Sequence, residues 1–210
     1  MSDKEVLAKG LAQLGLDLSD VAQQQLLDYL ALLQKWNKVH NLISRKESDN
    51  LVVRHLLDSL AALPYINGSR VVDVGSGAGL PGIPLAIACP RCHFTLLDCN
   101  SKKARFRNQA VIELGLKNVT VVDARAEEYR PEQGFDSVIS RAFATIADML
   151  EVAGHLAAPG GRFLALKGVY PEQELAELPD GYRLDVVHPL DVPLLGAERH
   201  LAIVVRAEDD

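Results

Sequence analysis

Three glycines, Gly75, Gly77 and Gly79, stand at alternate positions between a β-branched run at residues 71–74 and an apolar segment at residues 80–88. The run has the composition of a buried strand, and the segment predicts a helix. A strand, a turn without side chains and a helix start leave backbone N–H groups facing an open crevice. A ligand can come closer to such a turn than any Cβ would permit. We therefore expect a binding site there.

Two carboxylates stand beside this glycine turn. Asp73 lies inside the first strand, and Asp98 ends a second apolar run at residues 94–98. Asp98 stands nineteen positions after Gly79. A carboxylate at that spacing from the glycines can accept hydrogen bonds from both ribose hydroxyls of a nucleoside. The segment predicts a nucleoside site without naming the nucleoside, because residues 77–82 also fit the G-x-G-x-x-G pattern of dinucleotide-binding proteins.

The elements that must position these residues alternate between strand and helix from residue 70 onward. This alternation predicts an α/β fold with a doubly wound, mostly parallel sheet, closed by an antiparallel hairpin. Residues 1–62 have helical apolar spacing, so we expect an N-terminal helical extension at 1–66 and a second domain at 67–210. The predicted strands are residues 71–74, 94–98, 119–122, 135–140, 162–168, 184–187 and 201–205.

Charged residues follow the carboxyl ends of three predicted strands. Ligands of doubly wound sheets bind outside those ends, near the point where the strand order reverses. We therefore expect Arg141, after the fourth strand, to face the reacting end of the ligand. Lys167 ends the fifth strand and should point toward the same crevice, and residues 123–127 should lie on the adenine side.

Three helical segments carry polar groups whose role the sequence leaves open. Residues 35–46 combine bases, amides and an imidazole around Trp36, which suits phosphate and nucleotide contacts but also a solvated helix end. Arg54 and Asp58 are four residues apart and could form a simple helical ion pair. The first turns of the helix predicted at residues 101–114 carry four basic side chains, those of Lys102, Lys103, Arg105 and Arg107. These could be solvated surface charges or a surface that binds RNA phosphates.

Composition and charge bound the class of protein. The chain has 210 residues and a net charge of −6, so any nucleic-acid partner must be met by a local basic patch. No apolar run approaches the roughly 18 residues that a membrane span needs, and the N-terminus shows no secretory signal. These features favour a cytoplasmic protein without membrane contact.

The three cysteines suggest no cofactor. Cys89, Cys92 and His93 match the haem-attachment pattern C-x-x-C-H, but haem attachment implies export, and His93 should open the second core strand. A zinc site would need a second ligand pair, and a thioredoxin-like pair should begin a helix rather than follow one. We expect adventitious cysteines in a loop and no metal site.

With these segments placed, the chain resembles one bacterial family, the small-subunit ribosomal RNA guanine-N7 methyltransferases, also called glucose-inhibited division protein B. The matching segments span nearly the whole chain in the family's order. Residues 79–84 (GLPGIP) and 140–143 (SRAF) discriminate best, because general methyltransferases lack them. The other matches are 35–38 (KWNK), 41–42 (NL), 54–59 (RHLLDS), 72–78 (VDVGSGA), 97–98 (LD), 165–168 (ALKG) and 196–200 (GAERH).

The resemblance implies a Rossmann-like class I methyltransferase with a seven-stranded sheet and S-adenosyl-L-methionine as its cofactor. It also implies that Asp73 and the glycine turn hold the amino-acid end of that cofactor, while Asp98 occupies the ribose position. The expected cofactor contacts are Asp73, Gly75, Gly77, Gly79, Leu80, Asp98, Ala126, Glu127 and Arg141. The expected RNA contacts are Lys35, Asn37, Asn41, Arg54, His55, Arg125, Arg199 and His200.

The acceptor implied by the resemblance indicates the mechanism. Guanine N7 carries a lone pair and no proton, so methylation needs no general base, and catalysis should rest on alignment. Because the product base gains positive charge, we expect Arg141 to position the substrate or cofactor rather than to transfer protons, with Lys167 as the second catalytic candidate. The expected partner is 16S ribosomal RNA, within the assembled small subunit or a late precursor, and the enzyme is expected to be a monomer.

Three alternatives stay open at this point. A nicotinamide-dependent dehydrogenase would bind NAD and not S-adenosylmethionine. A methyltransferase acting on another RNA or on a small molecule is the second, and a small acceptor would be enclosed by a lid. A non-catalytic RNA-binding or assembly factor that retains the cofactor fold is the third.

Overall fold

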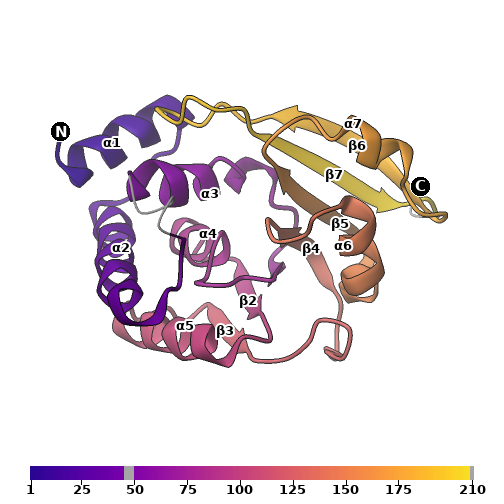
Figure 1. Ribbon diagram of the computed structural model, residues 1–210, viewed down its shortest axis with the longest axis horizontal. Coiled ribbons are helices and arrows are strands. Elements are labelled where there is room, and N and C mark those ends of the chain that lie inside the picture. Colours follow the sequence, from indigo (N-terminus) through magenta and orange to yellow (C-terminus); the bar gives the residue numbers. More distant parts are fainter. Residues whose placement is uncertain (45–49, 209–210) are drawn as a thin grey trace.

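The computed structural model describes residues 1–44 and 50–208. Its helices and strands follow the predicted order (Figure 1). The helical elements are α1 (Asp3–Leu14), α2 (Asp20–His40), η2 (Val52–Leu57), α3 (Asp58–Leu60), η3 (Leu63–Tyr65), α4 (Gly82–Ala88), α5 (Ser101–Glu113), α6 (Ile146–Ala153), η4 (Gly154–Leu156) and α7 (Glu172–Ala176). The strands are β1 (Arg70–Val74), β2 (His93–Leu97), β3 (Val119–Val122), β4 (Phe135–Ser140), β5 (Ala157–Lys167), β6 (Tyr182–Pro189) and β7 (His200–Arg206).

The strands form one sheet in the order β3-β2-β1-β4-β5-β7-β6. Strands β1 to β5 pair in parallel, and β7 pairs antiparallel with both β5 and β6. The order reverses between β1 and β4, so a ligand crevice opens at their carboxyl ends. This confirms the predicted α/β, doubly wound, mostly parallel seven-stranded sheet. Strand β5 begins at Ala157, earlier than predicted, with a register irregularity in its pairing with β4.

Alternate residues of the central strands face two different core layers, as the period of two along a strand requires. Val71 and Ile139 pack in a core that contains apolar residues of α1, α2, α4 and α5. Val72 and Val138 pack in a second core with residues of α6. Figure 1 accordingly shows α1, α2 and α4 on one side of the sheet and α6 on the other. Burial of both faces explains the continuous apolar runs in the sequence.

The N-terminal helices are built into the sheet's core. Ser2 and Glu5 form a capping box that starts α1, and Ser19 caps α2. The apolar side chains of both helices belong to the same core as the sheet face that α4 covers. The boundary after residue 66 therefore stays a prediction. Among the described residues, no helix is long and apolar enough to cross a membrane.

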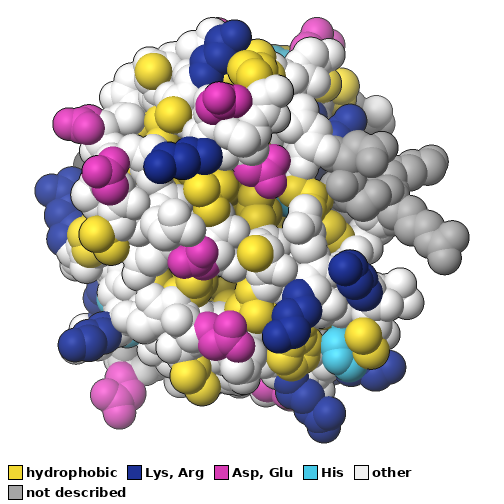
Figure 2. Space-filling view, turned by 90° about the vertical axis from the view of Figure 1, so that its left-hand side faces the viewer, with side chains coloured by type: hydrophobic (Ala, Val, Ile, Leu, Met, Phe, Trp, Pro, Cys, Tyr) yellow, Lys and Arg dark blue, Asp and Glu magenta, His cyan; other side chains and the backbone are white. Residues whose placement is uncertain are grey.

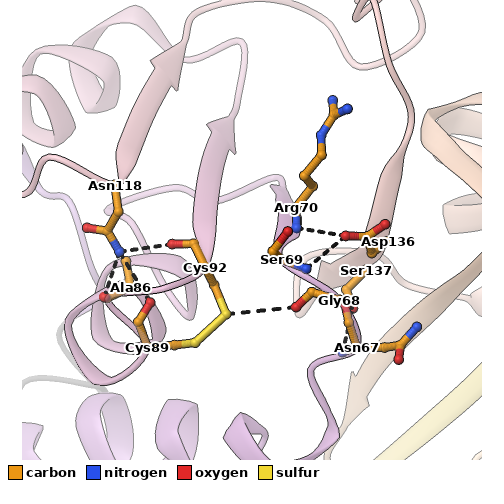
Figure 3. Close-up of a disulfide and its surroundings, with 10 residues drawn as sticks. All are labelled: Asn67, Gly68, Ser69, Arg70, Ala86, Cys89, Cys92, Asn118, Asp136 and Ser137. Atoms are coloured by element: carbon orange, nitrogen blue, oxygen red, sulfur yellow. Dashed lines mark hydrogen bonds between the residues drawn. A yellow bond between two sulfur atoms is a disulfide. The ribbon is translucent and has the colours of Figure 1, made fainter.

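The structure corrects the expectation of adventitious cysteines, because Cys89 and Cys92 form a disulfide directly after α4 (Figure 3). Both side chains are buried. Figure 3 shows the Asn118 amide donating to the carbonyl oxygens of Ala86, Cys89 and Cys92, at 2.9, 3.3 and 3.0 Å. His93 opens β2, as expected, so this loop lies at the opposite end of the strand from Asp98.

Candidate active site

The glycine turn leaves β1 at the point where the strand order reverses. Gly75, Gly77 and Gly79 all have positive φ, at 71°, 55° and 94°. A Cβ on Gly75 would lie 2.6 Å from the Cβ of Ala142, in the segment after β4. Only glycine can combine this backbone conformation with so close an approach.

Two buried side chains from other elements hold the carbonyl groups of this turn. The Tyr29 hydroxyl of α2 donates to the carbonyl oxygen of Ala78 at 2.9 Å. Arg107 of α5 donates from Nη1 to the carbonyl oxygen of Gly77 at 2.7 Å, and from Nη2 to that of Asp98 at 3.3 Å. Both side chains have 0% exposure. Arg107 is therefore neither a solvated charge nor an RNA contact, which corrects the expectation for that residue.

Asp73 is a buried carboxylate with one oxygen occupied. Its Oδ2 accepts a hydrogen bond from the N–H of Gly82 at 2.8 Å, which ties β1 to the start of α4. Its Oδ1 has no hydrogen-bond partner among the described residues. Burial raises the pKa of Asp73 to about 7, and the Gly82 hydrogen bond and nearby Arg141 oppose that rise. The orphaned oxygen is an acceptor beside the turn that a ligand donor can use.

Asp98 and the segment after β3 line a cavity of about 220 Å³ on the other side of the turn. The Asp98 carboxylate accepts the N–H groups of Gly77 and Asn100, both at 2.8 Å. This cavity brings together four of the residues expected to contact a cofactor, namely Gly75, Asp98, Ala126 and Glu127. Arg125 lines it as well, so it lies apart from the other residues expected to contact RNA.

A larger cavity, of about 510 Å³, covers the glycine turn itself. Its lining includes Gly75, Gly77, Leu80 and Arg141, as predicted for cofactor contacts, together with Asn41 from the end of α2. Gly79 does not line this cavity, and a Cβ there would meet the Ile83 side chain. Seven of the nine predicted cofactor residues therefore line two adjoining cavities, with Gly75 in both, whereas Asp73 and Gly79 line neither.

On its far side, Arg141 borders a third cavity of about 290 Å³, whose charged lining residues are Arg54, Asp58, Arg141, Lys167 and Arg199. Asp58 does not pair with Arg54, which corrects the helical ion pair weighed from the sequence. Its two oxygens instead contact Arg141 Nη1 at 3.2 Å and Arg199 Nε at 2.8 Å. The Arg54 side chain is exposed and makes no hydrogen bond or ion pair with another residue of 1–44 or 50–208.

Lys167 is held by two groups. Its Nζ forms an ion pair with Glu174 at 2.7 Å and donates to the carbonyl oxygen of Ala144 at 3.0 Å. Glu174 also accepts the N–H of Ile146 at 2.8 Å. Because these contacts fix the segment that follows Arg141, the structure favours a positioning role for Lys167.

The remaining residues expected to contact RNA lie in different places. Lys35 and Asn37 line a separate cavity beside α2, and Asn37 accepts the N–H of Ile43 at 2.9 Å. His55 is 1% exposed, so its side chain cannot contact RNA in this structure, which corrects that prediction. His200 lies edge-on to the exposed ring of Tyr170, with centroids 5.7 Å apart. Residues 45 and 46, in the same polar stretch as Lys35, lie outside the described residues.

Basic side chains gather at one edge of the face on which the N-terminal helices lie. Figure 2 shows lysine, arginine and histidine side chains gathered at the lower right of this face, whereas the rest of the face carries scattered acidic and basic side chains. Lys35, Lys38 and His40 are exposed at the end of α2. That end packs on α5 through Trp36 and Phe106, whose ring centroids are 5.7 Å apart. A net acidic chain thus presents a local basic edge.

Comparisons with known proteins agree with this geometry. Residues 22–202 match the family model described as GidB, rRNA small subunit methyltransferase G. The chain is 56% identical to the ribosomal RNA small subunit methyltransferase G of Aromatoleum aromaticum, over 95% of this chain and 97% of that protein. It is 51% identical to the protein of the same name from Nitrosospira multiformis, over 99% of each.

Solved structures show the same fold at much lower identity. An S-adenosylmethionine-dependent methyltransferase from Aquifex aeolicus aligns with a TM-score of 0.58 at 20% identity, over 81% of this chain and 96% of that one. The glycopeptide N-methyltransferase MtfA, solved with S-adenosyl-L-methionine, aligns with a TM-score of 0.62 at 12% identity, over 72% and 87%. The fold is therefore the Rossmann-like fold of class I methyltransferases. The family model matches most of the chain, and the two relatives are more than half identical to it over nearly its whole length. This chain therefore belongs to the GidB family of rRNA small subunit methyltransferases G.

Proposed function

We propose that this chain transfers a methyl group from S-adenosyl-L-methionine to N7 of one specific guanine in 16S ribosomal RNA. The observation that carries this proposal is the position of Arg141. It is a common wall of the cavity over the glycine turn and of the cationic cavity beyond it. One residue thus separates a space suited to the cofactor from a space suited to a polyanion.

The residues around the turn fit S-adenosylmethionine. Gly75 lines both adjoining cavities, so a ligand can lie against its backbone, and the orphaned Asp73 Oδ1 can accept a hydrogen bond from an amino group. Asp98 can still accept ribose hydroxyls, because a carboxylate offers about four lone-pair sites and the two backbone N–H groups use two of them. Ala126 and Glu127 line the same cavity, where we place the adenine.

When bound, S-adenosylmethionine supplies an electrophilic methyl group on a sulfonium sulfur. Guanine N7 carries a lone pair and no proton, so the chain needs no general base. The end of β4 agrees with this requirement. Ser140 donates its hydroxyl to the carbonyl oxygen of Val74 at 2.7 Å and accepts the N–H of Ala142 at 3.1 Å, so it braces the backbone.

The work left to the chain is alignment of the two reactants, which can lower the barrier by several kcal/mol, on the order of 7–11 in the best cases. Arg141 would supply this by positioning. Asp58 pairs with Arg141 and offsets its charge, which matters because the methylated base becomes cationic. Lys167 would fix the adjacent segment through Glu174 and Ala144.

The substrate is proposed to be the assembled small subunit or a late precursor, met by a cytoplasmic monomer that uses no metal ion and does not bind a membrane. Arg54, Arg199 and the basic edge of α2 support an RNA surface that is open rather than enclosed. A small-molecule acceptor would favour an enclosed pocket instead.

The test is methyl transfer from labelled S-adenosylmethionine to small subunits purified from cells lacking this protein. The RNA is digested, and the labelled nucleoside is identified by its mass and retention. We expect label in 7-methylguanosine at one position. Label in another nucleoside would overturn the acceptor atom, and label only in naked RNA would overturn the assembled subunit as substrate.

A further inference from the structure

The cationic cavity beyond Arg141 is a built site with more donors than its own acceptors can use. The basic residues that line it are Arg54, Arg141, Lys167 and Arg199, and among the described residues its one carboxylate lining residue is Asp58. Glu174 satisfies Lys167 from outside the lining. Each guanidinium offers five N–H donors. Asp58 engages one nitrogen of Arg141 and one of Arg199, so several donors stay unused at this cavity.

Asp58 fixes the relative position of two arginines from distant parts of the chain. It lies at the start of α3, while Arg141 follows β4 and Arg199 precedes β7. Its carboxylate is buried, and the two arginine side chains are only 22% and 24% exposed. Arginines held in this way keep their free N–H groups in one orientation, which suits an anion with several oxygens.

The chemistry of the cavity's rim favours RNA over a small anion. Val169 and Tyr170 follow Gly168, a lining residue, and are 68% and 52% exposed. The Tyr170 ring lies edge-on to His200, at a centroid distance of 5.7 Å. Exposed aromatic rings beside a cationic groove are typical of surfaces that bind single-stranded nucleic acid.

We infer that this cavity binds a backbone phosphate of the RNA strand that carries the target guanosine, and that Asp58 is a positioning residue that orients Arg141 and Arg199 toward that phosphate. The inference rests on the proposed function and names the substrate group that the cavity takes. A carboxylate of the cofactor is the other anion of similar chemistry, because Arg141 also borders the cavity over the glycine turn.

The Arg54→Gln variant tests the phosphate site. Arg54 is exposed and has no ion pair with another described residue, so its replacement leaves the fold intact. Arg91 is a matched control, because it is exposed in the loop before β2, at the opposite edge of the sheet. We expect Arg54→Gln to weaken small-subunit binding about fivefold or more and to reduce the slope of log affinity against log salt by about 0.7–0.9, whereas Arg91→Gln changes neither.

The Asp58→Asn variant separates positioning from net charge. Loss of the carboxylate makes the cavity more positive, so charge alone predicts tighter binding to RNA. Positioning predicts the opposite, a KM for subunits raised about tenfold or more, because the two arginines are no longer held together. Unchanged or tighter binding by Asp58→Asn would overturn the positioning role.

Subunit binding is measured by filter retention without methyl transfer, and S-adenosylmethionine binding by calorimetry on the same variants. Weaker subunit binding with unchanged cofactor affinity supports the inference. Weaker cofactor binding with unchanged subunit binding would assign the cavity to the cofactor carboxylate and overturn it, as would no change in either. Subunit binding by the wild-type chain without methyl transfer would instead contradict the proposed function alone.

Discussion

The glycine turn and the cationic cavity meet at Arg141 but are built in opposite ways. The turn is made of backbone groups that buried partners hold from α2, α5 and β1. The cavity is made of partly exposed side chains held by ion pairs. We propose the first as the seat of the cofactor and the second as a charged surface that meets the RNA. Changes to each region should therefore fail in different assays.

Arg141→Ala should have the largest effect, because Arg141 belongs to both regions. We expect methyl transfer to fall by about a hundredfold or more through lost alignment, with weaker binding of both cofactor and subunits. The measurement is the single-turnover rate at saturating S-adenosylmethionine, with Arg91→Ala as the control. An unchanged rate would remove Arg141 from the site.

Gly75→Ala should damage the turn and spare the cavity. The new Cβ would meet Ala142 at 2.6 Å, and the residue would have to keep a φ of 71°. A left-handed non-glycine residue alone costs about 1–2 kcal/mol, so we expect a Kd for S-adenosylmethionine raised about tenfold or more.

Gly160→Ala is the matched control for this change. Gly160 also has a φ of 71°, but a Cβ there has nothing within 4 Å. The variant should lose stability without losing cofactor affinity, by calorimetry and thermal unfolding. Equal cofactor affinity in the two variants would show that Gly75 serves the backbone conformation only.

The buried turn should also respond to pH through Asp73. Burial raises the pKa of Asp73 from 3.8 in its unperturbed form to about 7 in the folded chain. The folded state therefore keeps a proton that the unfolded state releases, and the contribution of Asp73 to the free energy of unfolding falls as pH rises from about 4 to about 7. Asp73→Asn should remove this decrease in urea titrations of the ligand-free chain. Parallel pH profiles for the two proteins would contradict the shift.

Tyr29→Phe should weaken the turn by a smaller amount. It removes the hydroxyl that donates to Ala78 and leaves a buried carbonyl oxygen without that donor. We expect about 1–3 kcal/mol less stability and a several-fold higher Kd for S-adenosylmethionine, with little change in subunit binding. Tyr65→Phe is the control, because the half-buried Tyr65 makes no hydroxyl hydrogen bond within the described part of the chain. Equal cofactor affinity in both variants would show that α2 does not brace the turn.

Cys99 offers the gentlest test of the adenine side. It is an exposed free thiol that lines the cavity with Asp98 and Ala126, whereas Cys89 and Cys92 are bonded. Saturating S-adenosylmethionine should slow its alkylation by iodoacetamide several-fold, followed by mass spectrometry, because the ligand would cover the thiol. NAD serves as the control ligand. Protection by NAD instead would revive the dinucleotide interpretation.

The same contrast explains what could be predicted from the sequence. The turn is encoded locally, since its glycines, strand and helix are contiguous, and the sheet follows from alternating apolar runs. The cavity joins Asp58 to Arg141 and Arg199 across separations of 83 and 141 residues, which no local pattern reveals. The helical spacing of Arg54 and Asp58 suggested a local pair, whereas tertiary contacts decide the partner.

Two basic residues with predicted surface roles, Arg107 and His55, are buried in the structure. Arg107 was grouped with exposed neighbours, yet Ala104 and Ala110 stand three residues away on either side and share its buried face. That spacing is a usable indication of burial. His55 lies in the apolar run that ends at Ala62, where a polar residue is more often a core residue than a surface contact.

The most direct test of the central claim is chemical mapping of the RNA in cells. Methylation at N7 leaves guanosine open to borohydride reduction and aniline cleavage, and primer extension then locates the break. In cells lacking this protein, the wild-type gene should restore one break in 16S RNA, and the Arg141→Ala gene should not. A wild-type gene that restores no break, while the protein is present and binds S-adenosylmethionine, would contradict N7 methylation of 16S RNA.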